Sequence, residues 1–405
     1  MSINKDSKKA PNLRFKGFTD DWEERKLGFF LTESRNIGTN GAQAKKLTVK
    51  LWGKGVIPKS ETNQGSKSTQ YYVRSSGQFI YGKLDFLNQA FGIIPDNLNG
   101  YESTLDSPAF DISKNLNKIF LLEYVSRESF YQYQGLIANG SRKAKRIHVD
   151  TFLNMPIKSP TNIEQEQIGN FIQLIDSTIT LHQRKLDRLN QLKEALLQQM
   201  FPVKGETVPK LRFAGFEGDW EERKLGELSN IVGGGTPSTS NPEYWDGDID
   251  WYAPAEIGEQ SYVSKSKKTI TELGLKKSSA RILPVGTVLF TSRAGIGNTA
   301  ILAKDATTNQ GFQSIVPDKK KLDSYFIFSR TNELKRYGEV TGAGSTFVEV
   351  SGKQMSKMPI KVPVLSEQQR IGTFFKSLDD TITLQQRKLD QLKNTKQVLL
   401  QNMFI

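Results

Sequence analysis

A stretch of 24 residues that occurs twice constrains this chain more than any other feature. Thr178–Phe201 reads TITLHQRKLDRLNQLKEALLQQMF and Thr381–Phe404 reads TITLQQRKLDQLKNTKQVLLQNMF, with 16 of the 24 positions identical. In and just before each copy, apolar residues recur in a 4-3 rhythm, which predicts a long amphipathic helix with a coiled-coil seam. The predicted seam residues are Ile168, Ile172, Ile175, Ile179, Leu186, Leu189 and Leu196 in the first helix, and Ile371, Phe375, Leu378, Ile382, Leu389, Leu392 and Leu399 in the second.

A lysine interrupts each apolar stripe at the same step, and the pair of lysines indicates how the helices are oriented. A parallel pair in register would place Lys193 against Lys396, two like charges inside a seam. In an antiparallel pair, Lys193 lies near Leu378 and Lys396 lies near Ile175, where the aliphatic stem packs and the ammonium group reaches water. We therefore predict an antiparallel pair.

A second repeat precedes the first and defines the frame of the chain. Pro11–Gly28 reads PNLRFKGFTDDWEERKLG and Pro209–Gly226 reads PKLRFAGFEGDWEERKLG, with 14 of 18 positions identical; we call these the opening segments. The repeat unit is thus an opening segment, a variable insert and the long helix. The two inserts, residues 29–154 and 227–357, align only weakly with each other. The sequence predicts two dissimilar heads carried by one duplicated frame.

Both inserts are predicted to be α+β. Short apolar runs broken by glycine and Asn-Gly turns predict strands at 78–81, 90–94, 287–291 and 300–302. Helical periodicity predicts helices at 116–133 and 322–337. The first long helix is expected to start near Asn162, and Ser366 followed by Gln369 has the spacing of a capping box at the start of the second.

Composition narrows the classes of function. The chain contains no cysteine, which excludes disulfides, thiolate metal sites and cysteine nucleophiles. Its net charge is +13, divided as +8 up to residue 208 and +5 after it, and this excess predicts a polyanionic partner, nucleic acid first. No apolar run approaches the ~18 residues of a membrane span, and the first residues are polar, so we expect a cytoplasmic protein with no membrane contact.

Three motifs are typical of enzymes, but each is incomplete. Asn241–Tyr244 lacks the second proline of the amino-methyltransferase loop, and Gly295–Ala300 is followed by a strand pattern instead of the helix that holds a pyrophosphate. Asp318, Glu333 and Lys335 have a loose nuclease spacing, although the last two fall in a predicted helix. We expect no catalytic residue, no metal and no cofactor on this chain. A stand-alone Mg²⁺-dependent nuclease is the enzymatic alternative.

Basic and amide side chains favour DNA binding instead. Arg142–Arg146 places four cations in five residues, which suits phosphate contacts that carry no base preference. In the second insert, Ser292–Arg293 and Asn309–Gln310 flank a glycine-rich turn, and Arg, Asn and Gln can contact base edges. The predicted DNA-binding residues are Lys83, Arg142, Lys143, Lys145, Arg146, Thr236, Ser292, Arg293, Asn309, Gln310, Ser345 and Thr346.

The order of these parts resembles the specificity (S) subunit of a type I restriction–modification system. Both opening segments end in WEERKLG, and several motifs of the second insert are typical of the recognition domains of that family. These motifs are Gly234–Ser238 (GGTPS), Asn241–Trp245 (NPEYW), Gly247–Trp251 (GDIDW), Ser292–Gly297 (SRAGIG) and Asn309–Gly311 (NQG). The first insert shows this pattern poorly.

The resemblance implies an α+β fold in which two globular target-recognition domains are joined by two long helices that form an antiparallel coiled coil, with a pseudo-twofold repeat. The expected domains are an N-terminal opening segment at 1–28 with its first ten residues disordered, target-recognition domain 1 at 29–157, helix 1 and a linker at 158–208, the second opening segment with target-recognition domain 2 at 209–360, and helix 2 at 361–405.

The resemblance also implies a function. Each domain would read one half of an asymmetric bipartite target in double-stranded DNA, and the helix pair would set the spacer without any catalysis by this chain. Two modification subunits, which are adenine methyltransferases using S-adenosylmethionine, would dock on it, and restriction subunits would add an endonuclease that uses ATP and Mg²⁺. The candidate docking residues are Gln183, Arg184, Lys185, Gln386, Arg387 and Lys388. A coiled-coil adaptor without DNA binding is the second alternative.

Overall fold

The computed structural model divides into two compact units, and the division falls inside both long helices. Unit 1 comprises Met1–Gln183 with Lys388–Ile405, and unit 2 comprises Arg184–Arg387. Of the ten residues expected to be disordered, 1–8 lie outside the described part of the chain. The structure describes residues 9–60, 66–136, 139–141, 144–258, 260–293, 295–342 and 349–405, and leaves the side chains of 139–141, 144 and 145 out.

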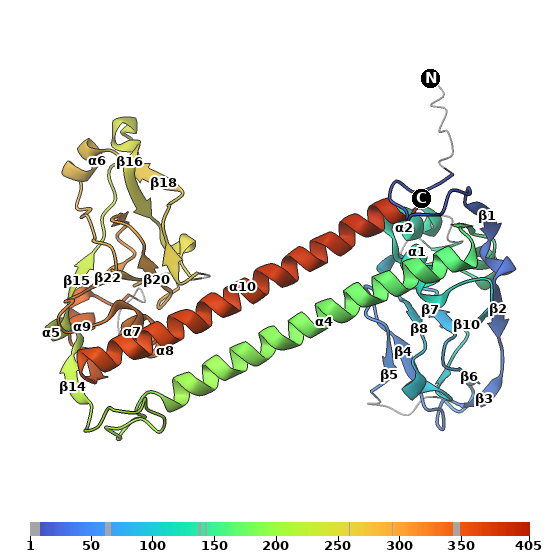
Figure 1. Ribbon diagram of the computed structural model, residues 1–405, viewed down its shortest axis with the longest axis horizontal. Helices are drawn as coiled ribbons and strands as arrows, with labels where there is room; N and C mark the ends of the chain where they lie inside the picture. The colour runs from blue at the N-terminus through green and yellow to red at the C-terminus, as the bar shows by residue number, and fades with distance from the viewer. Residues whose placement is uncertain are drawn as a thin grey trace. The chain divides into compact units, whose positions relative to one another are not determined.

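Unit 1 is built around a four-stranded antiparallel sheet with the order β2-β10-β7-β8 and a three-stranded sheet with the order β3-β6-β9 (Figure 1). Its strands are β1 Glu23–Lys26, β2 Leu31–Ser34, β3 Ile37–Asn40, β4 Leu47–Val49, β5 Val56–Pro58, β6 Gln70–Val73, β7 Phe79–Tyr81, β8 Phe91–Ile93, β9 Glu102–Ser103, β10 Ala109–Ile112, β11 Asn139–Ser141, β12 Ala144–Arg146 and β13 Pro156–Ser159. Its short helices are α1 Lys118–Ser126, α2 Glu128–Gly135 and α3 Val149–Leu153. Aromatic rings fill the core, with Phe152 of α3 stacked 5.6 Å from Phe79.

Unit 2 contains a five-stranded sheet with the order β15-β22-β19-β20-β17 and a three-stranded sheet with the order β18-β16-β21. Its strands are β14 Glu221–Lys224, β15 Ser229–Gly233, β16 Trp245–Tyr252, β17 Tyr262–Val263, β18 Lys268–Ile270, β19 Val288–Phe290, β20 Thr299–Leu302, β21 Thr307–Thr308, β22 Gln313–Pro317 and β23 Pro359–Val362. Its helices are α5 Leu225–Leu228, α6 Glu272–Lys276, α7 Ser324–Phe328, α8 Thr331–Gly342 and α9 Gly352–Ser356.

The predicted strands are confirmed as β7, β8, β19 and β20, whereas two predicted helices are each divided. Arg127 interrupts the first with an extended backbone (φ −71°, ψ 138°), which separates α1 from α2. The first long helix, α4 (Asn162–Gln199), begins as predicted. The capping-box prediction is wrong, because α10 (Leu365–Met403) already contains Ser366 and the carbonyl of Val364 accepts the amide of Glu367 at 3.0 Å.

The two parts of the repeated frame are paired strand to strand within each unit. β1 of the first opening segment lies antiparallel to β13, and β14 of the second lies antiparallel to β23 in the same register. Two matched ion pairs fasten the opening segments to the long helices. Arg14 Nε lies 2.6 Å from Glu164 Oε1 in unit 1, and Arg212 Nη2 lies 2.8 Å from Glu367 Oε2 in unit 2, with both carboxylates fully buried.

Within each unit, the start of one long helix packs beside the end of the other, which confirms the antiparallel prediction. In unit 1, Ile168 and Ile172 of α4 share a core with Met403 and Phe404 at the end of the chain. In unit 2, Met200 at the end of α4 shares a core with residues from the start of α10. None of the fourteen predicted seam residues is exposed; six of them are fully buried, namely Ile168, Ile172, Leu186, Ile371, Phe375 and Leu389.

The two seam lysines lie beside the residues that follow Leu378 and Ile175 and remain partly exposed, and each also forms an ion pair that was not predicted. Lys193 Nζ lies 2.6 Å from Asp379 Oδ1, and Lys396 Nζ lies 2.8 Å from Asp176 Oδ1. Lys396 also contacts Glu123 of α1 at 3.2 Å. Burial by itself would lower the pKa of Lys396, but Glu123 and Asp176 outweigh this effect, so the pKa is raised. A reciprocal pair of ion pairs therefore satisfies the charges inside the seam.

Candidate nucleic-acid interface

Two backbone hydrogen-bond patterns place Lys83 of unit 1 and Ser292 of unit 2 at the same position of their domains. The amide of Lys83 donates to the carbonyl of Asp106 at 2.9 Å, and the amide of Ser292 donates to the carbonyl of Gly311 at 2.8 Å. The carbonyl of Lys83 accepts from Ile147 at 3.0 Å, and that of Ser292 accepts from Val350 at 3.0 Å. The positions after β7 and after β19 are thus structurally equivalent.

In unit 2, three separate sequence motifs converge at this position. Thr236 donates a hydrogen bond from its hydroxyl to the side chain of Gln310. The amide of Gly235 donates to the carbonyl of Thr308 at 2.8 Å, and a Cβ on Gly234 would lie 1.9 Å from the carbonyl oxygen of Asn309. Only glycine allows two backbones to approach this closely. The predicted residues of the second insert are therefore brought together, and we call Thr236, Ser292, Arg293, Asn309 and Gln310 site 2.

The side chains of site 2 do not all face outward. Asn309 accepts a hydrogen bond from the amide of Gly311 at 2.7 Å, which shapes the turn, whereas Gln310 is exposed at its tip. Ser292 is fully buried, and its hydroxyl has no hydrogen-bond partner among the described residues. Ser292 and Asn309 are thus better placed to hold the site than to contact a ligand in this conformation.

Arg293 is the half-buried cation of site 2. Its backbone forms an antiparallel bridge with Glu349. Within the described part of the chain, its guanidinium takes part in no ion pair and no hydrogen bond, although residues 294 and 343–348 next to it are not described. The predicted residues Ser345 and Thr346 fall in that segment and lie outside the described residues. A guanidinium with free donors is suited to base edges and phosphates alike.

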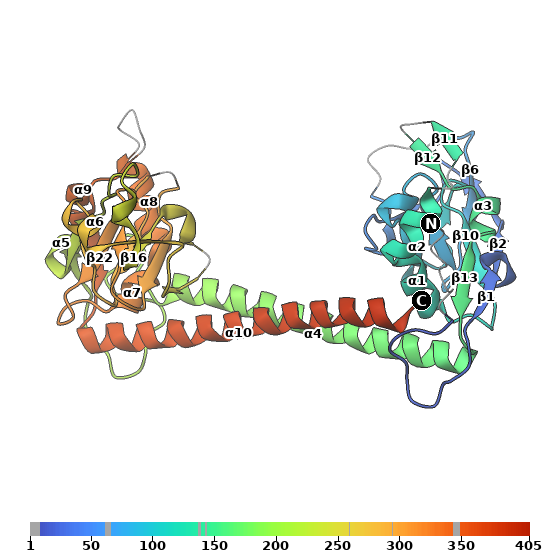
Figure 2. The same ribbon diagram turned by 90° about the horizontal axis from the view of Figure 1, so that it is seen from above.

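In unit 1, the equivalent position carries a different set of charges, which we call site 1: Lys83, Asp106 and Arg146. Arg146 Nη1 lies 2.9 Å from Asp106 Oδ1, and both side chains are exposed. Lys83 is half-buried, and burial lowers its pKa. The hairpin β11–β12 that leads to Arg146 lies on the side of unit 1 away from α4 (Figure 2). Sequence reasoning missed Asp106.

Neutralising Arg142, Lys143, Lys145 and Arg146 together is expected to weaken DNA binding without changing the preferred bases. Phosphate contacts position a protein on DNA and carry no base preference. Each lost contact should reduce the slope of log affinity against log salt by about 0.9. Arg142, Lys143 and the side chain of Lys145 lie outside the described residues, so this stays a prediction. Titration of labelled duplexes at several salt concentrations measures it, and altered base preference would contradict it.

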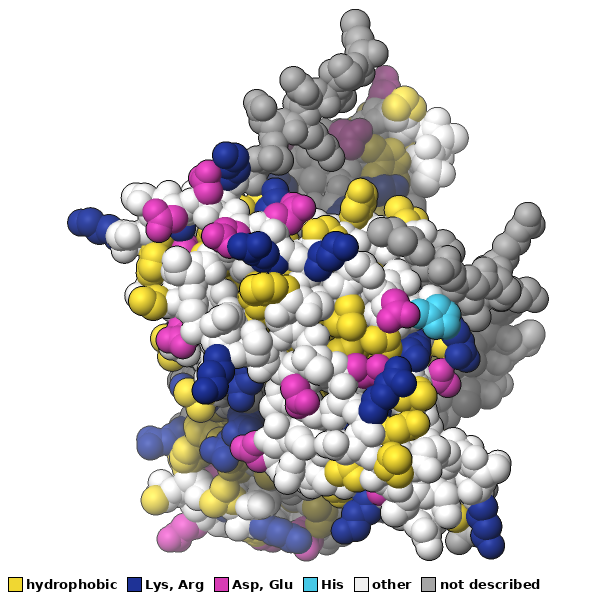
Figure 3. All heavy atoms as spheres, turned by 90° about the vertical axis from the view of Figure 1, so that its right-hand side faces the viewer, with side chains coloured by type: hydrophobic (Ala, Val, Ile, Leu, Met, Phe, Trp, Pro, Cys, Tyr) yellow, Lys and Arg dark blue, Asp and Glu magenta, His cyan; other side chains and the backbone are white. Residues whose placement is uncertain are grey.

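Charge is not gathered on every face of unit 1. On the face that carries β1 and β2, Lys and Arg side chains are scattered singly among Asp and Glu (Figure 3).

The predicted docking residues are mostly exposed on the long helices. Gln183 is half-buried, and the exposed ones are Arg184, Lys185, Gln386, Arg387 and Lys388. These six side chains are therefore largely accessible at the surface of the long helices.

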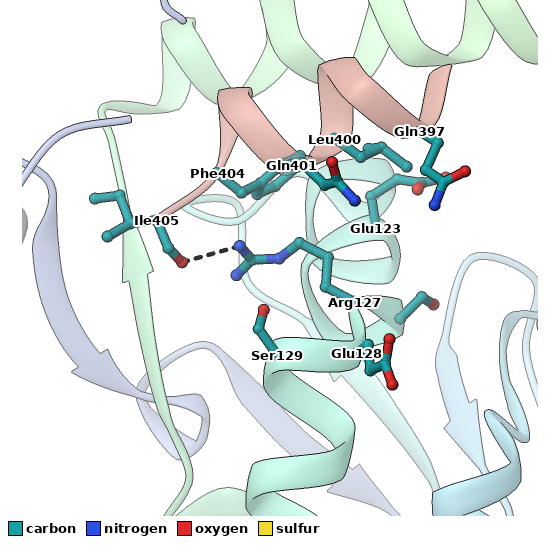
Figure 4. Close-up of a pocket in the computed structure, with 10 residues that line it drawn as sticks. Glu123, Arg127, Glu128, Ser129, Gln397, Leu400, Gln401, Phe404 and Ile405 are labelled. Carbon is teal, nitrogen blue, oxygen red and sulfur yellow. Dashed lines mark hydrogen bonds between the residues drawn. The ribbon is translucent and has the colours of Figure 1, made fainter. Parts of the chain in front are cut away.

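A pocket of about 620 Å³ in unit 1 lies beside the end of α10 and contains none of the predicted DNA-binding residues. Figure 4 shows the guanidinium of Arg127 pointing to the carbonyl oxygen of Ile405, to which Nη1 donates at 2.9 Å. The same guanidinium lies 4.9 Å from the ring centre of Phe404. In unit 2, Arg330 lies over Phe201 in the same way. Both arginines anchor the end of a long helix to its domain.

The residues with nuclease spacing do not form a common site. Asp318 pairs with Lys321 at 3.2 Å, Glu333 accepts from Arg330 at 2.7 Å, and Lys335 lies 4.0 Å from Glu339. Among the described residues, no group of three acidic or histidine side chains could hold a metal ion. As predicted, the turn at Gly295–Asn298 is followed by strand β20 and not by a helix.

Across all of the residues that the structure describes, no helix is long and apolar enough to cross a bilayer.

The chain is similar to known DNA specificity proteins. The family model of the type I restriction modification DNA specificity domain matches residues 217–394. The MjaIX type I specificity subunit of Methanocaldococcus jannaschii is 37% identical over 190 residues, which cover 46% of this chain and 44% of the relative. Residues 217–394 thus match the type I restriction modification DNA specificity domain, and the chain is similar to type I specificity subunits.

Other specificity subunits match longer parts of the chain. The EcoR124I/EcoR124II specificity subunit of Escherichia coli is 28% identical over 61% of this chain and 61% of its own length. The aligned regions thus span about half of the length of these two curated relatives. The crystal structure of the S subunit from M. genitalium shares the fold, with a TM-score of 0.64, 13% identity and coverage of 98% of this chain and 99% of that one. The S subunit fold therefore extends over both units.

Proposed function

We propose that this chain is an S subunit that recognises DNA sequence for a type I restriction–modification complex and is not itself an enzyme. Each recognition domain reads one half of an asymmetric, bipartite target in double-stranded DNA. The observation that carries this proposal is the contrast between equivalent positions: site 1 presents Lys83, Asp106 and Arg146, whereas site 2 presents Thr236, Arg293 and Gln310. Two similar frames with different chemistry at the same place are suited to two different half-sites.

The partners follow from the same proposal. Two modification subunits, which bring S-adenosylmethionine, dock on the long helices near Gln183–Lys185 and Gln386–Lys388, and the helix pair sets the spacer between the half-sites. Restriction subunits bring ATP- and Mg²⁺-dependent cleavage. The chain itself binds no cofactor and works in the cytoplasm, where host DNA is accessible. Matching residues at both docking positions support two copies of one partner.

Methylome sequencing of a host carrying the specificity and modification genes tests this function. The expected result is adenine methylation at one asymmetric motif whose two halves are separated by a fixed gap. A host that carries only the modification gene is the control, and it should lack this motif. Methylation at an ungapped palindrome would contradict the proposal.

Two alternatives predict other outcomes. A stand-alone nuclease would cut DNA when the purified chain is given Mg²⁺ alone, and the separate ion pairs of Asp318, Glu333 and Lys335 argue against it. A coiled-coil adaptor would not bind DNA at all. An affinity for DNA that falls steeply with salt would exclude an adaptor as the whole function.

A further inference from the structure

We infer that Asp106 reads an exocyclic amino group of a base, that of cytosine first, in the half-site contacted by unit 1. The inference rests on the proposed function and deepens it, because it assigns a specificity residue to the domain whose sequence shows the family pattern poorly. Asp106 lies in site 1 with Lys83 and Arg146.

Asp106 occupies the position in unit 1 that Gly311 occupies in unit 2. The carbonyl of Asp106 accepts the amide of Lys83 as the carbonyl of Gly311 accepts the amide of Ser292. The turns leading to them are also alike: the amide of Asp106 donates to the hydroxyl of Thr104 at 3.3 Å, and that of Gly311 donates to the side chain of Asn309 at 2.7 Å. Residues 104–106 of unit 1 are therefore the counterpart of 309–311, a motif typical of the recognition domains.

The carboxylate of Asp106 has one oxygen available to accept a hydrogen bond from a base. Its Oδ1 is held by Arg146 at 2.9 Å, whereas Oδ2 makes no interaction within the described residues, and 56% of the side chain is exposed. An unaccompanied carboxylate would be repelled by DNA phosphates, but Lys83 and Arg146 supply two cations beside it. An ionised carboxylate only accepts hydrogen bonds. In the major groove it therefore selects the amino group of cytosine. It can also accept from the amino group of adenine, but the N7 atom beside that group is an acceptor, which a carboxylate does not match.

Folding does not require the ion pair between Asp106 and Arg146. Arg146 and Asp106 are 44% and 56% exposed, and exposed ion pairs contribute little to stability. Variants of Asp106 are therefore expected to fold. A contact of this kind discriminates against a wrong base by about tenfold or more.

The test is methylome sequencing with the full chain and its modification subunit, comparing the wild type with Asp106→Ala and Asp106→Asn. We expect one position in one half-site to lose its preference by about tenfold in Asp106→Ala, with the other half-site and the gap unchanged. The base pair at that position in the wild type, C·G or A·T, identifies whether the amino group of cytosine or that of adenine is read. If it is cytosine, Asp106→Asn should shift the preference toward adenine, which an asparagine amide matches. Glu128→Gln, an exposed carboxylate of α2, is the matched control.

Two results would overturn the inference while the wild-type motif keeps the proposed function intact. They are an unchanged motif in both variants, and uniformly weaker methylation at every site without a change of bases. A wild type that methylates no gapped motif would instead remove the proposed function itself.

Discussion

Replacing Lys396 with methionine is expected to lower the free energy of unfolding of unit 1 by about 3–5 kcal/mol. The substitution keeps the aliphatic stem but removes the cation that faces Glu123 at 3.2 Å and Asp176 at 2.8 Å. The Glu123 side chain is only 15% exposed, so its charge would stay buried without a partner. Chemical denaturation, followed by a probe in unit 1, measures the change.

The loss of stability in Lys396→Met should also depend on pH. Burial raises the pKa of Glu123, and Lys396 opposes this rise, so removing Lys396 raises it further. The pKa of a carboxyl group in an unfolded chain is roughly 4.3. A carboxyl group whose pKa is higher in the folded state contributes stability at pH values below roughly 4.3, where it is protonated. This contribution is lost as the pH rises through the pKa of the folded state. The deficit of Lys396→Met relative to the wild type should therefore be small near pH 4 and full at neutral pH.

Two further variants separate this mechanism from a general effect of losing a lysine. Lys376→Met removes an exposed pair with Asp380 on the same helix and should cost no more than about 0.5 kcal/mol. Adding Glu123→Met to Lys396→Met should recover most of the lost stability, because no buried charge remains. Equal losses in Lys376→Met and Lys396→Met would show that the ion pair in the seam has no special role.

Replacing residues 227–357 with residues 29–154 is expected to change one entire half of the target. The chain would then carry the first insert twice, and the methylated motif should become two copies of one half-site with the original gap. The junctions are compatible because β1–β13 and β14–β23 pair in the same register at both ends of the inserts. Methylome sequencing reads the result directly.

Exchanging only the opening segments, residues 11–28 and 209–226, is the control for this replacement. They are identical at 14 of 18 positions and lie in the frame, so the motif should stay that of the wild type. Retention of the original asymmetric motif after the exchange of inserts would mean that the inserts do not determine the target.

The candidate site shows where sequence reasoning reached its limit. Thr236, Arg293 and Gln310 were predicted from separate motifs, but their convergence depends on β15, β22 and β19 being neighbours in one sheet. Asp106 was not predicted, because residues 104–106 share no residue with Asn309–Gly311. Their equivalence lies in backbone hydrogen bonds, which do not depend on the side chain. The domain boundaries and the DNA contacts stay predictions.

The repeated helix was determined by the sequence alone. Its apolar period and its length follow from apolar residues spaced 3 and 4 apart. Its antiparallel pairing follows from two lysines, whose like charges cannot face each other in a seam. Only the tertiary structure decided what neutralises those charges. Asp176 and Asp379 lie beside the apolar stripe, and whether such a neighbour meets the lysine of the other helix depends on how the two surfaces pack. Glu123 comes from α1, a contact that no periodicity within the helix predicts. Local spacing therefore specifies the helices, whereas their ion pairs depend on contacts between residues far apart in the chain.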